Sequence, residues 1–578
     1  MTKDTPDTGF ADHELVAPSM AALLEEATRE HAGRPAFSCV LPNGAYATLA
    51  FEDIGRHSDA LAFYLREGLG LAPGDVVAIQ SPNCLAYPVA AYAAMKAGLT
   101  LTGINPLYTA GEANHQLRDS GAKALFVIDL FGDRLDAALA GTDVEHVIRL
   151  SVVDFFPAHK RALIHAVMKY ARKQIPPMRR RSVSLADALR RGAALGRGRS
   201  VLELTRDRSL DDVAIFQYTS GTTGRSKGAE LTERNLLVNI TQQDRYTGPK
   251  VREEDIANPT SLLVLPLYHV YALAIGAMSS MRMGAHLVLP PSPRPIANLR
   301  PAFEKFEITM LPGINTLFSE LLKQDWFVQN PPRSLRWCFS GAAPLSPAIR
   351  QRWREVTGVR IFEGYGLTEG TCTVTSSPLD DTDKEGTVGK PLPGTEIRIL
   401  DDDGNAVPPG EPGEVVIRGP QVMRGYRGRP EATAETIRDG WLHTGDIGVM
   451  DEDGYLSIVD RKKDMLIVSG FNVYPAEIEA VLTGHAGVAE AAVVGVPDER
   501  HGEAAWAYVV RRDPALTAAA LATHCAAALT NYKRPRRFVF VDELPKSPVG
   551  KILRRELRDR ARAAADEATT ETAAGTPA

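Results

Sequence analysis

The sequence predicts an α/β protein: a large N-terminal domain of α/β sheets plus a small β region, followed by a small α+β C-terminal domain. Two observations support this prediction. Short apolar runs rich in β-branched residues alternate with helix-like segments along much of the chain. The chain has 578 residues, which is too long for one ordinary hydrophobic core. We therefore expect at least two domains.

The composition is that of a globular protein, with 44% hydrophobic and 24% charged residues. The formal net charge of -5 gives no general reason to expect nucleic acid as a partner. The five cysteines are odd in number and widely scattered, without the paired spacing of a zinc site or a disulfide framework. The N-terminal segment is acidic where a signal peptide would be basic and then apolar. These features predict a reducing, cytoplasmic location.

The elements of the first domain follow from apolar spacing. Three-to-four spacing predicts helices near both ends of the segment 20–69. A strand, helix and strand rhythm follows, and it repeats more weakly further along. The segments that carry it are 75–82, 87–98, 100–106, 122–129 and 146–152. They predict a sheet with helices on its faces.

The longest uncharged span, from Asn258 to Met281, exceeds the length needed to cross a bilayer. Proline, tyrosine, histidine, glycine and several serines interrupt it. We therefore expect a buried strand followed by a buried helix rather than a membrane span.

A basic segment, 158–181, breaks the strand and helix rhythm. If it is helical, one face carries apolar residues while lysines and arginines stay on or near the solvent side. Such an element is able to lie on an anionic membrane, and it is equally consistent with a solvated helix packed on its own domain. Both interpretations stay open. The apolar face would consist of Leu163, Ile164, Val167, Met168 and Ala171.

The stretch from Tyr218 to Gly228 has the composition of a phosphate-binding loop. It follows an apolar run, 212–218, so it leaves the carboxyl end of a strand, where α/β sheets place ligands. Its glycines free the backbone to point amides at an anion, its hydroxyls add donors and Lys227 adds a positive charge. The glycines lack the spacing of a Walker loop, which disfavours a Walker-type NTPase.

This loop resembles the Ser/Thr/Gly-rich loop of the adenylate-forming superfamily, which includes acyl-CoA synthetases, luciferases and the adenylation domains of peptide synthetases. Further motifs occur in the family's order, and the resemblance covers about residues 20 to 560. It is strongest to bacterial long-chain fatty acid CoA ligases, without a departure at a catalytic position. The motifs are Pro266-Leu-Tyr-His269, Tyr365-Gly-Leu-Thr-Glu369, Trp441-Leu-His-Thr-Gly-Asp446, Asp460-Arg-Lys-Lys-Asp464 and Pro545-Lys-Ser-Pro-Val-Gly-Lys551.

The resemblance implies a catalytic group of four residues. Lys551 would bridge the substrate carboxylate and the α-phosphate, and His269 would line the acyl pocket near that carboxylate. Thr368 would lie at the α-phosphate and Glu369 would bind magnesium. The resemblance also implies binding sites for ATP and coenzyme A. These consist of Thr219, Ser220, Gly221, Thr222, Thr223, Gly224, Lys227, Gly341, Ala342, Glu363, Gly364, Tyr365, Asp446 and Arg461 for ATP, and Ser469, Gly470 and Phe471 for coenzyme A.

The function that the resemblance implies is ATP-dependent ligation of a long-chain or medium-chain fatty acid to CoA. It would pass through an acyl-AMP and release AMP and pyrophosphate, with ATP, Mg²⁺ and coenzyme A required. The alternative is an acyl or aryl adenylating enzyme that loads a carrier protein or activates a non-fatty acid. A fatty acyl-AMP ligase would carry an insertion after the hinge, and none follows Lys463. A non-enzymatic lipid-binding protein would be expected to lack Glu369, Arg461 or Lys551, and all three are present.

The resemblance further implies a division into residues 1–460, which bind AMP, and 461–562, a mobile domain that carries Lys551 and pivots near Lys463. Residues 563–578 have no periodicity, and we expect them to be disordered. The expected partners are the fatty acid, ATP and CoA, with a homodimer and contact of 158–181 with the inner face of the membrane as further expectations. Acyl chain length and oligomeric state stay open.

Overall fold

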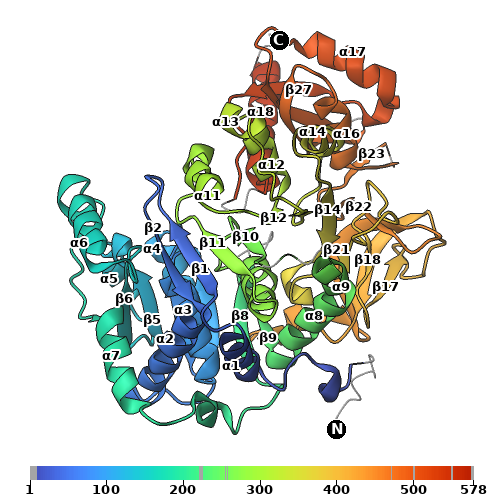
Figure 1. Ribbon diagram of the computed structural model, residues 1–578. Helices are drawn as coiled ribbons and strands as arrows, with labels where there is room; N and C mark the ends of the chain where they lie inside the picture. The colour runs from blue at the N-terminus through green and yellow to red at the C-terminus, as the bar shows by residue number, and fades with distance from the viewer. Residues whose placement is uncertain are drawn as a thin grey trace.

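The computed structural model describes residues 10–219, 226–253, 256, 258–469, 471–498, 501–547 and 551–574, with side chains up to residue 565 in the last segment (Figure 1). Two large sheets and two smaller ones make up the described part of the chain. This arrangement confirms the predicted α/β class, the small β region and the small C-terminal α+β unit. The C-terminal elements of the described chain lie at the top of the view in Figure 1.

The first large sheet is built around parallel strands that are buried along nearly their whole length, as parallel strands covered by helices are. Two antiparallel strands, β9 and β19, complete one edge. The spatial order is β19 (Gly425–Tyr426), β9 (Lys227–Thr232), β8 (Val213–Thr219), β4 (Thr100–Ile104), β3 (Val76–Gln80), β5 (Ala122–Ile128), β6 (His146–Leu150) and β7 (Val183–Ser184).

The second large sheet is parallel in its centre and antiparallel at both edges. Its N-terminal hairpin pairs with a strand that comes about 250 residues later, since Phe37 is opposite Leu287. The order is β16 (Lys390–Pro391), β15 (Thr375–Ser376), β14 (Ile361–Tyr365), β13 (Trp337–Ser340), β12 (Met310–Gly313), β10 (Thr260–Leu262), β11 (His286–Leu289), β1 (Pro35–Val40) and β2 (Tyr46–Ala50).

Helices cover these sheets, and one core cluster runs through both sheets and the helices between them. The helices are α1 (Met20–Glu30), α2 (Phe51–Phe63), α3 (Ala86–Lys96), α4 (Ala110–Ser120), α5 (Leu135–Ala138), α6 (Ala158–Ala166), α7 (Leu185–Leu195), α8 (Glu233–Tyr246), α9 (Gly248–Glu253), α10 (Ser280–Arg282), α11 (Arg300–Lys305), α12 (Asn315–Leu322), α13 (Asp325–Val328), α14 (Pro347–Thr357) and α15 (Pro430–Thr436).

Helix α3 is buried along its whole length, including its last residue, Lys96. The Lys96 ammonium group pairs with Glu25 of α1 and, at 2.6 Å, with Asp59 of α2. Breaking such a buried pair by removing one partner costs about 3–5 kcal/mol, because a charge is left without compensation. This ion triad therefore fixes the three helices against one another.

The span from Asn258 to Met281 folds as predicted. Strand β10 is buried, and the buried helix that follows is a π-helical segment, Tyr271–Ser279. None of the helices in the described part of the chain is long and apolar enough to cross a membrane.

The basic segment is helical, first as α6 and then as a π-helical turn, Val167–Ala171. The apolar side chains that were predicted to share one helix face differ in burial. Ile164 and Met168 pack against the core, while Leu163, Val167 and Tyr170 are 66%, 41% and 72% exposed. In Figure 1 this helix lies at the far left edge of the molecule. The segment thus keeps apolar and basic side chains together in solvent.

The small β region is antiparallel, with the order β17 (Glu396–Leu400), β18 (Pro412–Arg418), β21 (Trp441–Met450) and β20 (Ile437–Arg438), and with β22 (Leu456–Arg461) on β21. The C-terminal unit follows after a turn. Its strands are β24 (Phe471–Val473), β23 (Leu466–Val468), β26 (Gly502–Arg511) and β25 (Val488–Asp498) in spatial order, with β27 (Arg537–Val541) on β26, and its helices are α16 (Pro475–Thr483), α17 (Ala518–Ala528) and α18 (Arg554–Ala574).

Helix α18 continues to Ala574, so the backbone of residues 563–574 is helical where the sequence analysis expected disorder. Leu557 and Ala561 are buried in a cluster with side chains of β25 and β26, which anchors the first turns. The following residues are rich in alanine, the residue with the highest helix propensity, so the helix extends beyond its packed part. Residues 575–578 lie outside the described residues.

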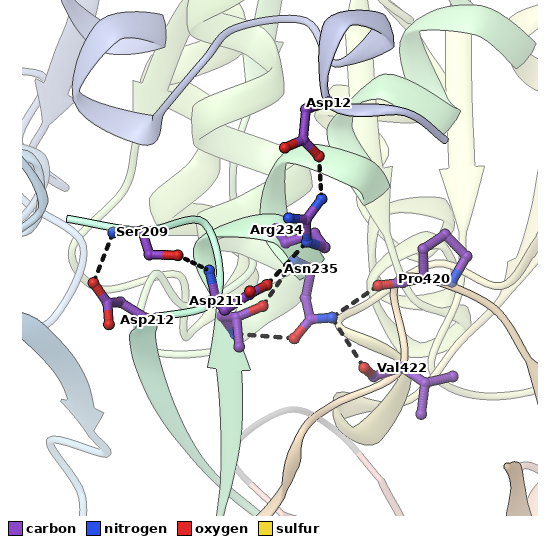
Figure 2. A network of polar contacts seen from close by, with 9 residues as sticks. Asp12, Ser209, Asp211, Asp212, Arg234, Asn235, Pro420 and Val422 are labelled. Atoms are coloured by element: carbon purple, nitrogen blue, oxygen red, sulfur yellow. Dashed lines mark hydrogen bonds and ion pairs between the residues drawn. The ribbon is translucent and has the colours of Figure 1, made fainter. Parts of the chain in front are cut away.

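Helix α8 ties three parts of the chain together at its N-terminus (Figure 2). Thr232 caps the helix, and Arg234 pairs with Asp12 and, at 3.0 Å, with Asp211. The Asn235 side-chain amide donates to the carbonyl oxygens of Pro420 and Val422, at 2.8 and 3.0 Å. The segment that leads to β19 is therefore fixed on the helix that follows β9.

Candidate active site

The residues predicted to act on the substrates line one cleft of about 1910 Å³. Elements of both large sheets, the small β region and the C-terminal unit all contribute to it. Six predicted site residues, Ser220, Gly221, Thr222, Thr223, Gly224 and Gly470, lie outside the described residues. The predicted residues that line the cleft are Thr219, Lys227, His269, Gly341, Ala342, Glu363, Gly364, Tyr365, Thr368, Glu369, Asp446, Arg461 and Lys551.

Several of these residues lie where strands of the large sheets end. Thr219 is the last residue of β8, and Tyr365 is the last residue of β14. Parallel strands end at a common edge, which is where open α/β sheets bind ligands. Gly366 follows at a point where the backbone passes very close, because a Cβ there would lie 1.5 Å from the Cys372 carbonyl oxygen. Only glycine fits there, and it allows the chain to turn toward Thr368 and Glu369.

Three side chains form a hydrogen-bonded group at one side of the cleft. The Tyr365 hydroxyl donates to Asp446 Oδ2 at 2.6 Å, and Arg461 Nε lies 3.3 Å from Asp446 Oδ1. The register of β21 on β22 places Asp446 directly opposite Arg461. Burial, and then the Asp446 charge, raise the pKa of Tyr365 well above its usual value, so its hydroxyl stays protonated. The group offers carboxylate acceptors beside an aromatic ring, as a nucleoside requires.

His269 is present as a neutral ring with a defined tautomer. Burial lowers its pKa to about 4, and the nearby charge of Lys551 acts in the same direction. The Tyr271 backbone N–H donates to His269 Nδ1 at 3.4 Å, so the ring proton is on Nε2. His269 can therefore donate a hydrogen bond to an anion without carrying a charge.

Lys551 reaches the cleft from the C-terminal unit. Its pKa is lowered, mainly by burial and then by the Arg461 charge, while Asp446 and Glu369 oppose this shift. Lys551 lines the cleft together with Asp446, Arg461 and Glu369. The Lys551 backbone N–H donates to Ser547 Oγ at 3.1 Å, and a β-bridge joins Lys546 to Ile552. The chain around Lys551 is thus supported on both sides.

Glu363, which the resemblance implies in nucleotide binding, already has a partner for its carboxylate. Its carboxylate pairs with Arg350 of α14, and both side chains are about nine-tenths buried. Burial raises the pKa of Glu363 to about 7, an effect that Arg350 opposes. The residue lines the cleft, but its carboxylate is engaged with α14. Ala342 also lines the cleft, with a φ of 63°, a strained value for a residue with a side chain.

Of the residues implied to contact coenzyme A, the two that the structure describes, Ser469 and Phe471, do not line the cleft. Ser469 and Phe471 lie on the β23–β24 hairpin, and Phe471 is 55% exposed and stacks on Tyr532 at 4.6 Å. The structure thus brings the nucleotide and acyl residues together and leaves this hairpin apart from them.

Comparison with known proteins identifies the family. A model of the AMP-binding enzyme family matches residues 24–427, and a model of the AMP-binding enzyme C-terminal domain matches residues 477–551. The chain belongs to the AMP-binding enzyme family. It is 44% identical over 551 residues to a protein named long-chain-fatty-acid–CoA ligase from Escherichia coli O6:H1, with 95% of each chain covered.

Solved structures of AMP-binding enzymes share the fold. The anthranilate CoA ligase AuaEII in complex with anthranoyl-AMP is 26% identical, with a TM-score of 0.81, 96% of this chain covered and 100% of that chain. ATP-bound MatB from Rhodopseudomonas palustris is 29% identical, with a TM-score of 0.79, 93% of this chain covered and 98% of that chain.

The donor set of this AMP-binding enzyme fits a magnesium ion bound together with its nucleotide. Among the described residues no group of three or more His, Cys, Asp or Glu side chains is able to hold a metal ion. Mg²⁺ needs no such cage, because it is usually bound by one or two carboxylates and by the phosphates of the substrate. Glu369 supplies one carboxylate at the cleft.

Two buried polar atoms of this AMP-binding enzyme indicate a polar ligand. Gln217 Oε1 and Ser340 Oγ line the cleft and have no hydrogen-bond partner in the described part of the chain. Buried polar atoms without partners are costly, so a ligand or water is expected to satisfy them. Sequence reasoning missed both, and it also missed Tyr426, whose hydroxyl donates to Glu369 Oε1 at 2.6 Å. No local pattern around these residues indicates a site.

Proposed function

We propose that the protein is an ATP-dependent long-chain fatty acid–CoA ligase. It joins a fatty acid to AMP, releases pyrophosphate, and then transfers the acyl group to coenzyme A with release of AMP. The observation that carries the proposal is the convergence of Lys551, His269 and Glu369 on the Tyr365–Asp446 pair in one cleft. The 44% identity to a protein named long-chain-fatty-acid–CoA ligase supports the same activity.

The first step brings together two anions, the fatty carboxylate and ATP, and the site supplies positive groups that neutralise them. A carboxylate is a poor electrophile, and attaching AMP gives it a good leaving group. The fatty carboxylate attacks the α-phosphorus, and the bond to pyrophosphate breaks. Lys551 neutralises the carboxylate and the α-phosphate as they meet, while Lys227 lies at the start of β9 for the departing phosphates. Magnesium bound at Glu369 would neutralise further phosphate charge.

His269 contributes a neutral donor to this step. Because its proton is on Nε2 and its pKa is about 4, it can bind a carboxylate oxygen without forming a competing ion pair. The hydrogen bond from His269 then orients the carboxylate, and Lys551 neutralises its charge.

An acyl chain fits the part of the cleft beyond His269. One wall is the π-helical segment with Tyr271, Ile275 and Gly276, and the opposite wall includes Met310 and Phe339 from the second large sheet. Each methylene buried against such walls contributes about 0.8 kcal/mol. The far end includes Asp244, which is paired with Arg252 at 2.7 Å and therefore has no need of a charged substrate partner.

The alternative substrate is a non-fatty carboxylic acid, since one similar structure is named an anthranilate CoA ligase. Ser279 and Ser280 also line the cleft and would suit a polar group. Transfer to a carrier protein instead of CoA is the other alternative from the sequence. Both are decided by the same experiment.

The second step requires the C-terminal unit, residues 461–562, to turn near Lys463 relative to residues 1–460. This follows from the contrast between Lys551, which is in the cleft, and the hairpin with Ser469 and Phe471, which is not. Turning the unit would withdraw Lys551 and present that hairpin to coenzyme A. The two half-reactions thus use different faces of one unit.

The segment 158–181 supplies a surface for an anionic membrane, where fatty acids accumulate. It combines the exposed Leu163, Val167 and Tyr170 with basic residues on the same exposed segment. We expect a cytoplasmic protein that binds the inner face of the membrane reversibly. A homodimer also remains a prediction, which light scattering of the purified protein tests.

A pyrophosphate-release assay with acids from acetate to oleate, with and without CoA, tests the proposed function. We expect the highest kcat/KM with long or medium chains and acyl-CoA as the product. Preference for acetate, an aromatic acid or an amino acid would contradict the fatty acid assignment. Pyrophosphate release without any thioester product would indicate a different acceptor.

A further inference from the structure

Tyr426 contacts two charged groups of the site with different parts of its side chain. Its hydroxyl donates to Glu369 Oε1 at 2.6 Å, and Lys227 Nζ lies 5.1 Å from the centre of its ring. The residue lines the cleft. Among the salt bridges of the described residues, none joins Lys227 to Glu369. The two opposite charges are thus held by one tyrosine without neutralising each other.

The position of Tyr426 follows from strand register. Strand β19 pairs antiparallel with β9, so that Tyr426 is directly opposite Ala229. Lys227 precedes Ala229 by two residues and therefore points to the same face of the sheet. Diagonal neighbours on one face are within reach of an aromatic ring and a long side chain. The contact between the ring and the ammonium group is a direct result of this pairing.

The backbone around Tyr426 is fixed from several sides. The Tyr426 N–H donates to Thr433 Oγ1 at 2.9 Å, and the Arg427 N–H donates to the Gly228 carbonyl at 2.9 Å. The Met423 N–H donates to the carbonyl oxygen of Glu369 at 2.7 Å. Upstream, the Asn235 amide binds the segment at residues 420 and 422 (Figure 2).

The Tyr426 hydroxyl is the donor in this hydrogen bond, because an ionised carboxylate only accepts hydrogen bonds. A neutral donor on a charged acceptor gives one of the stronger hydrogen bonds found in proteins, and it fixes the rotamer of the carboxylate. The second carboxylate oxygen of Glu369 remains available to a ligand.

We propose that Tyr426 is a positioning residue that sets Glu369 and Lys227 in one arrangement before the metal and nucleotide bind. Glu369 then presents its carboxylate to the metal ion, and Lys227 presents its charge to the phosphates. The proposal rests on the proposed adenylation function. According to this proposal, Tyr426 fixes the distance between the Glu369 carboxylate, which binds the metal, and the Lys227 ammonium group, which binds the phosphates.

Two variants separate the two contacts. Tyr426→Phe removes the hydroxyl bond to Glu369 and keeps the ring beneath Lys227. Tyr426→Leu removes both contacts. The first measurement needs no catalysis: Mn²⁺ is titrated by electron paramagnetic resonance in the presence of α,β-methylene-ATP. Loss of a hydrogen bond to a charged group predicts roughly tenfold weaker Mn²⁺ binding for Tyr426→Phe.

The second measurement is the Mg²⁺ dependence of pyrophosphate exchange into ATP. We expect Tyr426→Phe to need about tenfold more Mg²⁺ for half-maximal rate and to recover kcat at saturating metal. Tyr426→Leu should not recover, because Lys227 also loses its support, and its KM for ATP should rise. A tyrosine with a merely structural role is not expected to raise the Mg²⁺ requirement while leaving kcat at saturating metal unchanged.

Tyr455→Phe is the matched control. The Tyr455 side chain is buried outside the cleft, and its hydroxyl donates to the Thr382 carbonyl. It should leave both measurements unchanged. Unaltered Mn²⁺ affinity in Tyr426→Phe, with its fold intact, would overturn the proposal. If no carboxylic acid supports exchange in the unmodified protein, the ligase function fails, while the Mn²⁺ titration still decides the role of Tyr426.

Discussion

Lys551 and His269 are proposed to bind the substrate carboxylate in different ways. Lys551 contributes a positive charge, and His269 contributes a neutral hydrogen-bond donor. Lys551 lines the same cleft as Glu369 and Asp446, whose charges oppose the lowering of its pKa by burial. His269 stays neutral because burial and the Lys551 ammonium group lower its pKa. One cation is therefore placed where two anionic reactants meet, and the neighbouring ring does not compete for them.

Lys551→Ala should reduce adenylation by about 100-fold or more, because the anionic reactants would meet without their bridging cation. The assay is fatty-acid-dependent exchange of pyrophosphate into ATP. Conversion of supplied acyl-AMP and CoA to the thioester should persist. Lys533→Ala, which removes a partly buried lysine paired with Glu477 at 2.8 Å outside the cleft, is the control for exchange. Equal loss of both half-reactions in a folded Lys551→Ala variant would contradict the assignment.

Two π-helical segments lie at different surfaces of the protein. Tyr271–Ser279 forms a wall of the cleft, and Val167–Ala171 ends the exposed basic helix. The wider turn of the first places Tyr271, Ile275, Gly276 and Ser279 along the cleft. π-Helical turns often occur at functional sites, and here one of them lines the part of the cleft proposed to hold the acyl chain.

Gly276→Leu should shorten the acyl chain that the pocket accepts. Even a Cβ at this position would lie 2.8 Å from Leu263 Cδ1, so a larger side chain must turn into the cleft. Because each methylene contributes about 0.8 kcal/mol, kcat/KM for palmitate should fall by roughly fourfold for each carbon displaced. Activity with octanoate provides the internal control. An unchanged ratio of palmitate to octanoate would place the acyl chain elsewhere.

Charge reversal on the basic segment should weaken membrane binding without affecting the active site. Changing Lys169, Arg172, Lys173 and Arg179 to glutamate removes the attraction to anionic lipid, worth about 1 kcal/mol per basic residue near the surface. Sedimentation with phosphatidylglycerol vesicles measures binding, and activity on short soluble acids should be retained. Reversal of Arg300 on α11 and of Lys323 just after α12, both exposed basic residues, is the control. Absence of vesicle binding in the unmodified protein would leave the segment as a solvated surface.

Contacts around Lys463 stabilise the C-terminal unit in the orientation seen in the structure. Asp460 Oδ2 accepts from the Ala476 N–H at 2.8 Å, so a residue before the pivot caps the first turn of α16 after it. Asp464 pairs with Arg558 of α18 at 2.9 Å, which joins the pivot to the helix after Lys551. The first contact must break if the unit turns, while the second can move with it.

Lys463→Pro should favour one half-reaction over the other. Proline fixes φ near −65° and restricts the residue before it, so the pivot can adopt only orientations compatible with that value. Exchange of pyrophosphate into ATP and thioester formation from supplied acyl-AMP are measured separately. We expect one rate to persist and the overall reaction to fall by about tenfold or more. Equal retention of both rates would mean that the pivot lies elsewhere.

The sequence was sufficient for features that depend on local pattern. Strands β8 and β14 and the loops that follow them were predicted because apolar runs and special loop residues adjoin in the chain. Contacts between distant segments could not be predicted in this way. Tyr426 reaches Glu369 only through the pairing of β19 with β9, and Arg350 reaches Glu363 only through the packing of α14. The helical residues 563–574 were missed because periodicity was sought where alanine content decides.

Because β1 pairs with β11, the second large sheet cannot form until long after β1 has been synthesised. Strand β1 leaves the ribosome early, but its partner around Leu287 follows only about 250 residues after Phe37. At ordinary rates of translation this interval is roughly 10–50 s. During that time the edge of β1 that later pairs with β11 has no native partner, and such edges recruit other strands. The nascent chain is therefore expected to need a chaperone before its second sheet can close.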